Sequence, residues 1–175
     1  VTEWDAWQDK LKTEAEKRTA DLPEQNVLTA TGWYTGTPAL SPDGQKLAWV
    51  SSPANIVVAD VIEGELKNHR TVLERRAPDT LEWLGDTTLL YSRVVRQPGK
   101  EYLELFSLGL VTGKETQLTE NARAQFPNLM PDGCVLFVRD LYQEGSALRK
   151  FCKGEISSFW QAPEDSHIVG LDVSE

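Results

Sequence analysis

One segment recurs along the chain: a tight turn followed by a short apolar run. Two copies are clear, at residues 38–49 and 127–137, and a degenerate copy at 81–91 lies between them. The tail, residues 168–175, reads as a fourth copy that is cut as its turn begins. Equivalent positions are separated by 43, 46 and 44 residues, at Ser41, Leu84, Met130 and Ser174. A period in the mid-forties with four short strands per period is typical of β-propeller blades.

The turn in each copy has residues that favour a chain reversal. Proline presets φ at the second turn position, aspartate bonds its own backbone, and glycine accepts the positive φ that folds the chain back. The first and third copies contain Pro-Asp-Gly, whereas the second contains only Gly-Asp. We therefore predict structural roles for eight turn residues: Pro42, Asp43, Gly44, Gly85, Asp86, Pro131, Asp132 and Gly133.

Apolar side chains occupy adjacent positions in the strands expected after each turn. The first strand of each pair is expected at 47–50, 89–91 and 135–138, and the second at 56–59, 102–108 and 147–152. A sheet with one solvated face would alternate strictly between apolar and polar residues. These runs instead indicate strands with both faces buried, as in a blade packed between two neighbours.

The fold class that follows is all-β, a partial β-propeller of about three four-stranded blades preceded by one N-terminal α-helix. We expect blades at about residues 37–76, 79–121 and 126–164, and the start of the next at about 167–175. Propellers typically have about four to eight blades. We therefore expect a longer native protein, and self-association of this chain through open blade flanks.

Residues 1–22 follow a helical period. Their apolar stripe has the spacing i, i+3, i+7 and i+11: Trp4, Trp7, Leu11 and Ala15. Pro23 marks the end of the predicted helix. The helix either packs on the propeller or ends a preceding domain. Two tryptophans on one short helix require a large apolar partner, which favours the preceding domain.

The Ser-Pro-Asp-Gly turn with Lys-Leu-Ala-Trp after it, and a Leu-Thr pair before it, resembles the repeat of TolB-like (WD40-like) propellers over residues 26–175. That resemblance implies a six-bladed ring, a location in the bacterial periplasm or cell envelope, and protein partners. The segment from Trp4 to Trp7 is similar to envelope proteins in which a gluzincin metallopeptidase-like domain ends in a Trp-x-x-Trp helix before such a propeller. In such a protein the catalytic residues would lie upstream of Val1.

The charge balance excludes two classes of partner. Lys and Arg number 18 against 27 Asp and Glu, for a formal net charge of −9. Binding to nucleic acid depends on clustered basic residues, so we expect no nucleic-acid partner. No apolar run approaches the length of about 18 residues that a membrane helix needs, so we expect no membrane insertion.

No group of residues has the spacing of a catalytic, cofactor or metal site. His69 and His167 lie about a hundred residues apart and belong to no His-Glu-x-x-His motif. Ser157 and Ser158 lie in an ordinary strand pattern rather than a Gly-x-Ser-x-Gly elbow. Residues 32–36 lack the lysine of a phosphate loop. The Asp-Gly pairs are a full blade apart, so we assign them to turns rather than calcium binding.

Cys134 and Cys152 fall on the second and third strands of the third predicted blade. A hairpin centred near residues 143–146 would place them opposite each other, within reach of a disulfide. Two buried free thiols are the alternative. An oxidising envelope compartment would favour the disulfide.

Two functions from different classes fit these features. The first is a non-catalytic propeller module of a larger bacterial envelope protein, which binds an unidentified protein or peptide or gates an attached peptidase domain. The second is the propeller of a prolyl oligopeptidase-type serine peptidase whose α/β-hydrolase domain lies outside this chain. Under either function we expect no cofactor and no catalysis by these 175 residues alone.

Overall fold

The computed structural model describes residues 38–51, 54–74, 78–140, 145–164 and 166–173, together with Lys10 and Thr13, which are both helical. The rest of the predicted helix, its tryptophans and residues 26–37 at the start of the propeller-like part lie outside the described residues. The chain divides into two compact units, Val1–Thr31 and Gly32–Glu175. No helix among the described residues is long and apolar enough to cross a membrane.

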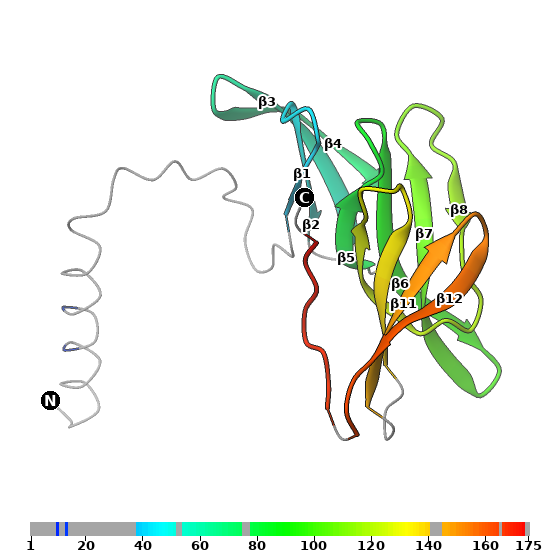
Figure 1. The fold of residues 1–175 in the computed structure, drawn as a ribbon. Coiled ribbons are helices and arrows are strands. Elements are labelled where there is room, and N and C mark those ends of the chain that lie inside the picture. Colours follow the sequence, from blue (N-terminus) through cyan, green and yellow to red (C-terminus); the bar gives the residue numbers. More distant parts are fainter. Residues whose placement is uncertain are drawn as a thin grey trace, which may run out of the picture. The chain divides into compact units, whose positions relative to one another are not determined.

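In the described part of the second unit, the strands form three antiparallel four-stranded sheets (Figure 1). Blade 1 contains β1 (Ala39–Leu40), β2 (Lys46–Ser51), β3 (Asn55–Ile62) and β4 (Glu65–Leu73). Blade 2 contains β5 (Pro78–Trp83), β6 (Thr88–Gln97), β7 (Lys100–Gly109) and β8 (Glu115–Gln117). Blade 3 contains β9 (Ala124–Leu129), β10 (Val135–Asp140), β11 (Ser146–Cys152) and β12 (Glu155–Gln161). Strands adjacent in the chain are also adjacent in each sheet, and the fold is a partial β-propeller.

The first described strands of blades 2 and 3 begin within two residues of the approximate starts expected from the sequence. β5 begins at Pro78 and β9 at Ala124, ahead of the expected starts at 79 and 126. The backbone pairing extends to these residues, because Pro78 lies opposite Arg93 and Ala124 lies opposite Arg139. Hydrophobic periodicity reports which side chains are buried, whereas a strand boundary depends on backbone pairing.

The described tail, residues 166–173, is not a strand, but it lies beside β9, the first strand of blade 3. We call the first strand of each blade its inner strand. Asn128 Nδ2 donates a hydrogen bond of 2.9 Å to the carbonyl oxygen of Leu171. The tail therefore contacts β9, and the start of a further blade at 167–175 stays a prediction.

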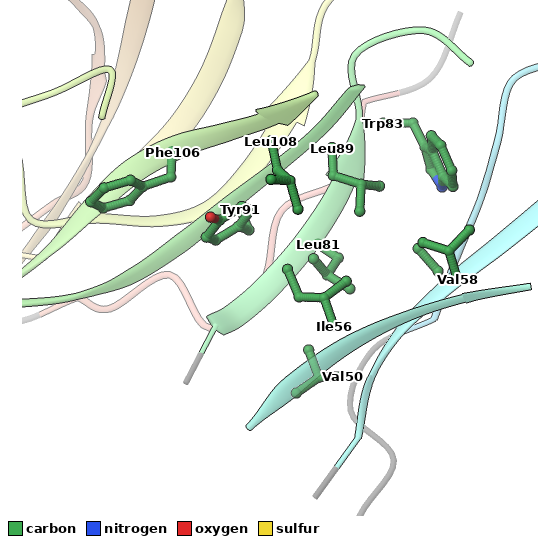
Figure 2. Close-up of a cluster of buried hydrophobic side chains, with 10 residues drawn as sticks. Val50, Ile56, Val58, Leu81, Trp83, Leu89, Tyr91, Phe106 and Leu108 are labelled. Atoms are coloured by element: carbon green, nitrogen blue, oxygen red, sulfur yellow. The ribbon is translucent and has the colours of Figure 1, made fainter. Parts of the chain in front are cut away.

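Blades 1 and 2 meet in an apolar cluster, which Figure 2 shows in close-up. Blade 1 contributes Ala48, Val50, Ile56 and Val58, and blade 2 contributes Leu81, Trp83, Leu89, Tyr91, Phe106 and Leu108. A second cluster joins blades 2 and 3 and consists of Leu90, Leu105, Ala122, Ala124, Val135 and Phe137. Blade 2 thus has apolar contacts on both faces.

Consecutive residues of β6 serve different interfaces. Leu89 and Tyr91 belong to the cluster shared with blade 1, and Leu90 belongs to the cluster shared with blade 3. All three side chains are 0% exposed. Successive side chains of a strand point to opposite faces, so a blade between two others requires apolar residues at adjacent positions. Each such burial contributes about 1.5–3 kcal/mol.

Hydrogen bonds between neighbouring repeats join positions about one period apart. The indole Nε1 of Trp83 donates to the carbonyl oxygen of Ala39 at 2.8 Å, across 44 residues. The backbone N–H of Asp43 donates to Asp86 Oδ1 at 3.2 Å, across 43 residues. Residues at equivalent positions of neighbouring repeats therefore lie next to each other in the structure.

Replacing Trp83 tests this arrangement. Trp83→Phe removes the donor to the Ala39 carbonyl and shrinks a side chain that is 1% exposed. We expect urea unfolding at pH 7 to give a free energy of unfolding lower by about 1–3 kcal/mol. Val111→Ala is the control, because Val111 is 83% exposed, and it should change stability by less than about 0.5 kcal/mol. Equal effects of the two substitutions would contradict the assigned role of Trp83.

Candidate functional site

The turn of blade 1 is closed by the residues predicted for it. The backbone N–H of Gly44 donates to the carbonyl oxygen of Ser41 at 2.8 Å, and Gly44 has a φ of +69°. Asp43 Oδ1 accepts hydrogen bonds from the Ser41 hydroxyl at 2.6 Å and from the Gln45 backbone N–H at 3.0 Å. These bonds, led by the one from Ser41, lower the pKa of Asp43. Pro42 precedes Asp43 in the same turn.

The turn of blade 3 has the same backbone bond and a different partner for its aspartate. Gly133 N–H donates to the Met130 carbonyl at 2.9 Å, after Pro131, and Asp132 Oδ1 accepts from the Cys134 N–H at 3.0 Å. Asp132 Oδ2 pairs with Lys150 Nζ at 2.5 Å, and this hydrogen bond lowers the pKa of Asp132.

In the shorter turn of blade 2, the aspartate accepts a hydrogen bond from the neighbouring blade. Gly85 has a φ of +77°, and the Leu84 N–H donates to the Thr88 carbonyl at 2.8 Å. Asp86 accepts from the backbone of Asp43 in blade 1, as described above. The three turn aspartates thus take part in turn and inter-blade bonds. Among the described residues, no group of three or more His, Cys, Asp and Glu side chains is arranged to hold a metal ion.

The structure joins Cys134 and Cys152 in a disulfide, the first of the two alternatives left by the sequence. Their Cα atoms are 4.9 Å apart, next to the pair formed by Val135 and Phe151 in the β10–β11 ladder. The bond therefore closes the end of this hairpin that also carries the Asp132–Lys150 ion pair.

The histidines and serines considered in the sequence lie on separate elements. His69 is on β4, with its ring edge-on to Trp49 at a centroid distance of 5.6 Å. Ser157 and Ser158 are exposed on β12, and the Ser157 hydroxyl donates to the Lys150 carbonyl at 3.4 Å. His167 is in the tail. Residues 32–36 lie outside the described part of the chain.

A buried carboxylate that the sequence analysis did not single out closes the outer part of blade 2. Glu104 is 1% exposed and accepts hydrogen bonds from the Thr119 hydroxyl at 2.7 Å and from the Ala122 N–H at 3.0 Å. The Thr119 hydroxyl oxygen in turn accepts from the Leu105 N–H at 3.0 Å. The threonine of the Leu-Thr pair therefore stabilises the blade, since a buried carboxylate requires such donors.

A pocket of about 370 Å³ lies where the inner segments of successive repeats converge, and we call it the axial pocket. Four segments line it: Pro38, Ala39 and Leu40; Thr80, Leu81 and Glu82; Phe126, Pro127 and Asn128; and Gly170, Leu171 and Asp172. The first three segments belong to, or adjoin, the inner strands β1, β5 and β9, and the fourth is the tail. Each repeat thus contributes one segment of three residues.

Two carboxylates give the axial pocket its charge. Burial raises the pKa of Glu82; a hydrogen bond from the Trp83 N–H opposes this shift, and the negative charge of Asp172 adds to it. The Trp83 N–H lies 2.8 Å from Glu82 Oε1, and Asp172 Oδ1 accepts from the Val173 N–H at 2.9 Å. Within the described ranges, neither carboxylate forms an ion pair with a basic side chain.

These carboxylates were missed at the sequence level, although the repeat contains a signal for them. Glu82 and Asp172 stand two residues before the aligned positions Leu84 and Ser174, so they are equivalent in the repeat. The two side chains meet in one pocket only if the same side of each inner segment faces its neighbours. The repeat period in the sequence does not indicate which side that is.

A larger cavity of about 700 Å³ lies on the outer parts of blades 2 and 3. It is lined by Val95, Gln97, Gln117, Leu118, Thr119, Glu120, Phe151, Gly154 and Ile156. Thr119 is already engaged in holding Glu104. The axial pocket is the better candidate site, because its polar groups come from equivalent positions of successive repeats.

Comparison with protein families finds no match for the sequence, and comparison with curated proteins finds none either. Solved structures do match. A puromycin-hydrolysing peptidase from Mycobacterium tuberculosis aligns with a TM-score of 0.62 and 19% identity, over 76% of this chain and 23% of that one. A prolyl endopeptidase aligns with a TM-score of 0.57 and 21% identity, over 86% and 26%. The acylaminoacyl peptidase of Pyrococcus horikoshii aligns with a TM-score of 0.52 and 18% identity, over 73% and 25%.

The chain spans about a quarter of the length of these solved structures. The aligned parts are β-propeller domains of peptidases. At such low identity the likeness shows the fold, in agreement with the three blades described above.

The raised pKa of Glu82 predicts a pH-dependent effect on stability. The folded state holds the Glu82 proton more tightly than the unfolded state, so the free energy of unfolding falls as pH rises from the ordinary value of 4.5 through the raised value. Glu82→Gln keeps an acceptor for the Trp83 N–H and removes the charge. We expect the variant to be more stable than the wild type at pH 7, with the difference disappearing below about pH 4.

Urea unfolding over this pH range measures that difference. Glu120→Gln is the control, because Glu120 is exposed, and it should show no such trend. A stability difference between Glu82→Gln and the wild type that is the same at every pH would contradict the account of Glu82.

The disulfide predicts a dependence on reductant. It links residues 18 positions apart, so reducing it should lower the free energy of unfolding by about 2–4 kcal/mol. Urea unfolding with and without a phosphine reductant measures the loss. The Cys134→Ser/Cys152→Ser double variant should start at the lower stability and be insensitive to reductant. Equal stability of the oxidised and reduced wild type would refute this role.

Proposed function

We propose that this chain is the propeller part of a prolyl oligopeptidase-type serine peptidase, and that it selects which peptides reach a catalytic α/β-hydrolase domain formed by other residues of the protein. The observation that carries this proposal is the alignment of the three blades with the propellers of peptidases, over 73% to 86% of the chain. The first of these acts on puromycin, and the others are named for prolyl and acylaminoacyl substrates.

The sequence contains no Gly-x-Ser-x-Gly elbow, which favours a selecting role for this chain rather than a catalytic one. A nucleophilic triad needs a serine, a base and an orienting group within hydrogen-bond reach of one another. His69, Ser157 and His167 lie on β4, β12 and the tail. The peptidase function would therefore reside in other parts of the protein, and this chain would control which peptides reach the catalytic domain.

The axial pocket suits a small peptide segment. Its volume of about 370 Å³ is at the lower end of ordinary ligand pockets, which span roughly 300–1,000 Å³. Its walls combine apolar side chains, among them Leu40 and Phe126, with a few polar groups. This composition is typical of a site that fixes the orientation of a bound segment.

A second candidate is a TolB-like binding module of the bacterial envelope, with a protein or peptide partner and, as the Trp-x-x-Trp segment implies, a metallopeptidase-like domain ahead of it. The disulfide between Cys134 and Cys152 favours this candidate, because disulfides persist in oxidising compartments such as the periplasm. Self-association through open blade flanks stays a prediction. Phe159 and Trp160, which are 52% and 49% exposed on β12, are the surface that we propose for it.

Labelling of the native protein separates the two candidates. The native protein would be captured with an antibody against this chain, treated with a fluorophosphonate probe for reactive serines, and mapped by mass spectrometry. We expect a labelled serine within Gly-x-Ser-x-Gly outside these 175 residues. The purified chain, as the control, should hydrolyse a peptide substrate no faster than buffer.

The opposite results are equally definite. A native protein with no labelled serine, whose sequence continues in further blades to its end, would replace the serine peptidase with the binding module. Turnover by the purified chain above the buffer rate would overturn the assignment of catalysis to other residues.

A further inference from the structure

Four equivalent positions of the repeat line the axial pocket with different side chains. They are Ala39, Glu82, Asn128 and Asp172, each two residues before the aligned turn position. Alanine and asparagine at two of these positions show that the blade fold does not require a carboxylate there. The acidic side chains of Glu82 and Asp172 therefore need an explanation other than blade formation.

Holding these two carboxylates in one pocket is electrostatically unfavourable. Glu82 is half-buried, and both burial and the charge of Asp172 disfavour its ionised form. The hydrogen bonds to them come from the backbone N–H groups of Trp83 and Val173, each next in sequence to its acceptor. A positive charge in the pocket would compensate both carboxylates, since an opposite charge within a few ångströms favours the ionised form.

The rest of the lining is apolar enough to hold the body of a ligand. Leu40 is 57% exposed although it borders the pocket, and Phe126, Pro127 and Leu171 complete this wall. An aliphatic stem or a neighbouring apolar side chain of a peptide would cover Leu40, while a charged end reached the carboxylates. A purely apolar ligand would instead leave the half-buried carboxylate of Glu82 and the exposed carboxylate of Asp172 uncompensated.

We propose that the axial pocket binds the cationic group of a peptide, with the carboxylates of Glu82 and Asp172 as the charge partners and Leu40 and Phe126 as the apolar wall. The cation is an ammonium or a guanidinium, supplied by the peptide's α-amine or by a lysine or arginine side chain. This inference rests on the proposed function only in taking a peptide as the ligand. The charge selectivity follows from the pocket itself.

Short synthetic peptides bound to the purified 175-residue chain test this selectivity. The reference probe is Ala-Phe-Lys-Ala-Ala, acetylated at its N-terminus and amidated at its C-terminus. A capped peptide with norleucine in place of lysine lacks only the ammonium group. A third peptide, with norleucine and a free α-amine, distinguishes the two sources of the cation. Titration by NMR at pH 7 and low salt gives the dissociation constants.

We expect the lysine peptide, the free-amine peptide or both to bind at least about tenfold more tightly than the capped norleucine peptide, a difference of about 1.4 kcal/mol. Glu82→Gln and Asp172→Asn should each reduce this preference, and the double variant should abolish it. These substitutions retain the acceptors for Trp83 N–H and Val173 N–H, so the fold should persist, as circular dichroism would verify. Glu120→Gln, in the outer cavity, is the matched control and should leave the preference unchanged.

Several results would overturn the proposal. These are equal binding of all three peptides, no detectable binding of any peptide at millimolar concentration, or a full preference for the cation in the folded double variant. The test of the proposed function is independent of the test of this site. Charge-selective binding by a chain whose native protein has no reactive serine would retain the cation site and reject the peptidase.

Discussion

The stacking of blade 2 between its two neighbours is the constraint on which the other features depend. Leu89 and Tyr91 pack toward blade 1 and Leu90 packs toward blade 3, all without solvent exposure. Such burial, at about 25 cal/mol per Å² of apolar surface, is the main favourable term in folding. It has no strong directionality, so the turns and the inter-blade hydrogen bonds are needed to set how the sheets align.

That alignment brings equivalent parts of successive repeats together. The Trp83 indole reaches Ala39, the Asp43 backbone reaches Asp86, and the Asn128 amide reaches Leu171, in each case across about one period. The axial pocket is a consequence of this geometry, because one inner segment from each of four repeats faces a common space. The side chains of Glu82 and Asp172 belong to neither apolar cluster, so blade packing does not account for them. A repeated scaffold can in this way acquire a specific site without altering its core.

Much of the fold was predictable because it depends on local pattern. Pro-Asp-Gly at 42–44 and 131–133 predicts the two turns, and adjacent apolar residues such as Leu89 and Leu90 predict strands buried on both faces. The facing positions of Cys134 and Cys152 follow from hairpin register, since they lie next to the pair Val135 and Phe151. The bonding of these cysteines does not follow from register alone, because it also depends on the redox environment.

By itself, the sequence determined the period, the turns, the strand hairpins and the burial of both blade faces, because each of these depends on residues close together in the chain. The tertiary structure decided the roles of Asp86, Glu104 and the two pocket carboxylates. Asp86 accepts from the blade 1 turn, Glu104 is held by a threonine and a backbone N–H beyond β8, and Glu82 meets the charge of Asp172. These contacts join segments up to two repeats apart. The contacts of Asp86 and Glu82 require the angle at which one sheet packs on the next, and the burial of many side chains together sets that angle. The contacts of Glu104 depend instead on how the chain folds back after β8.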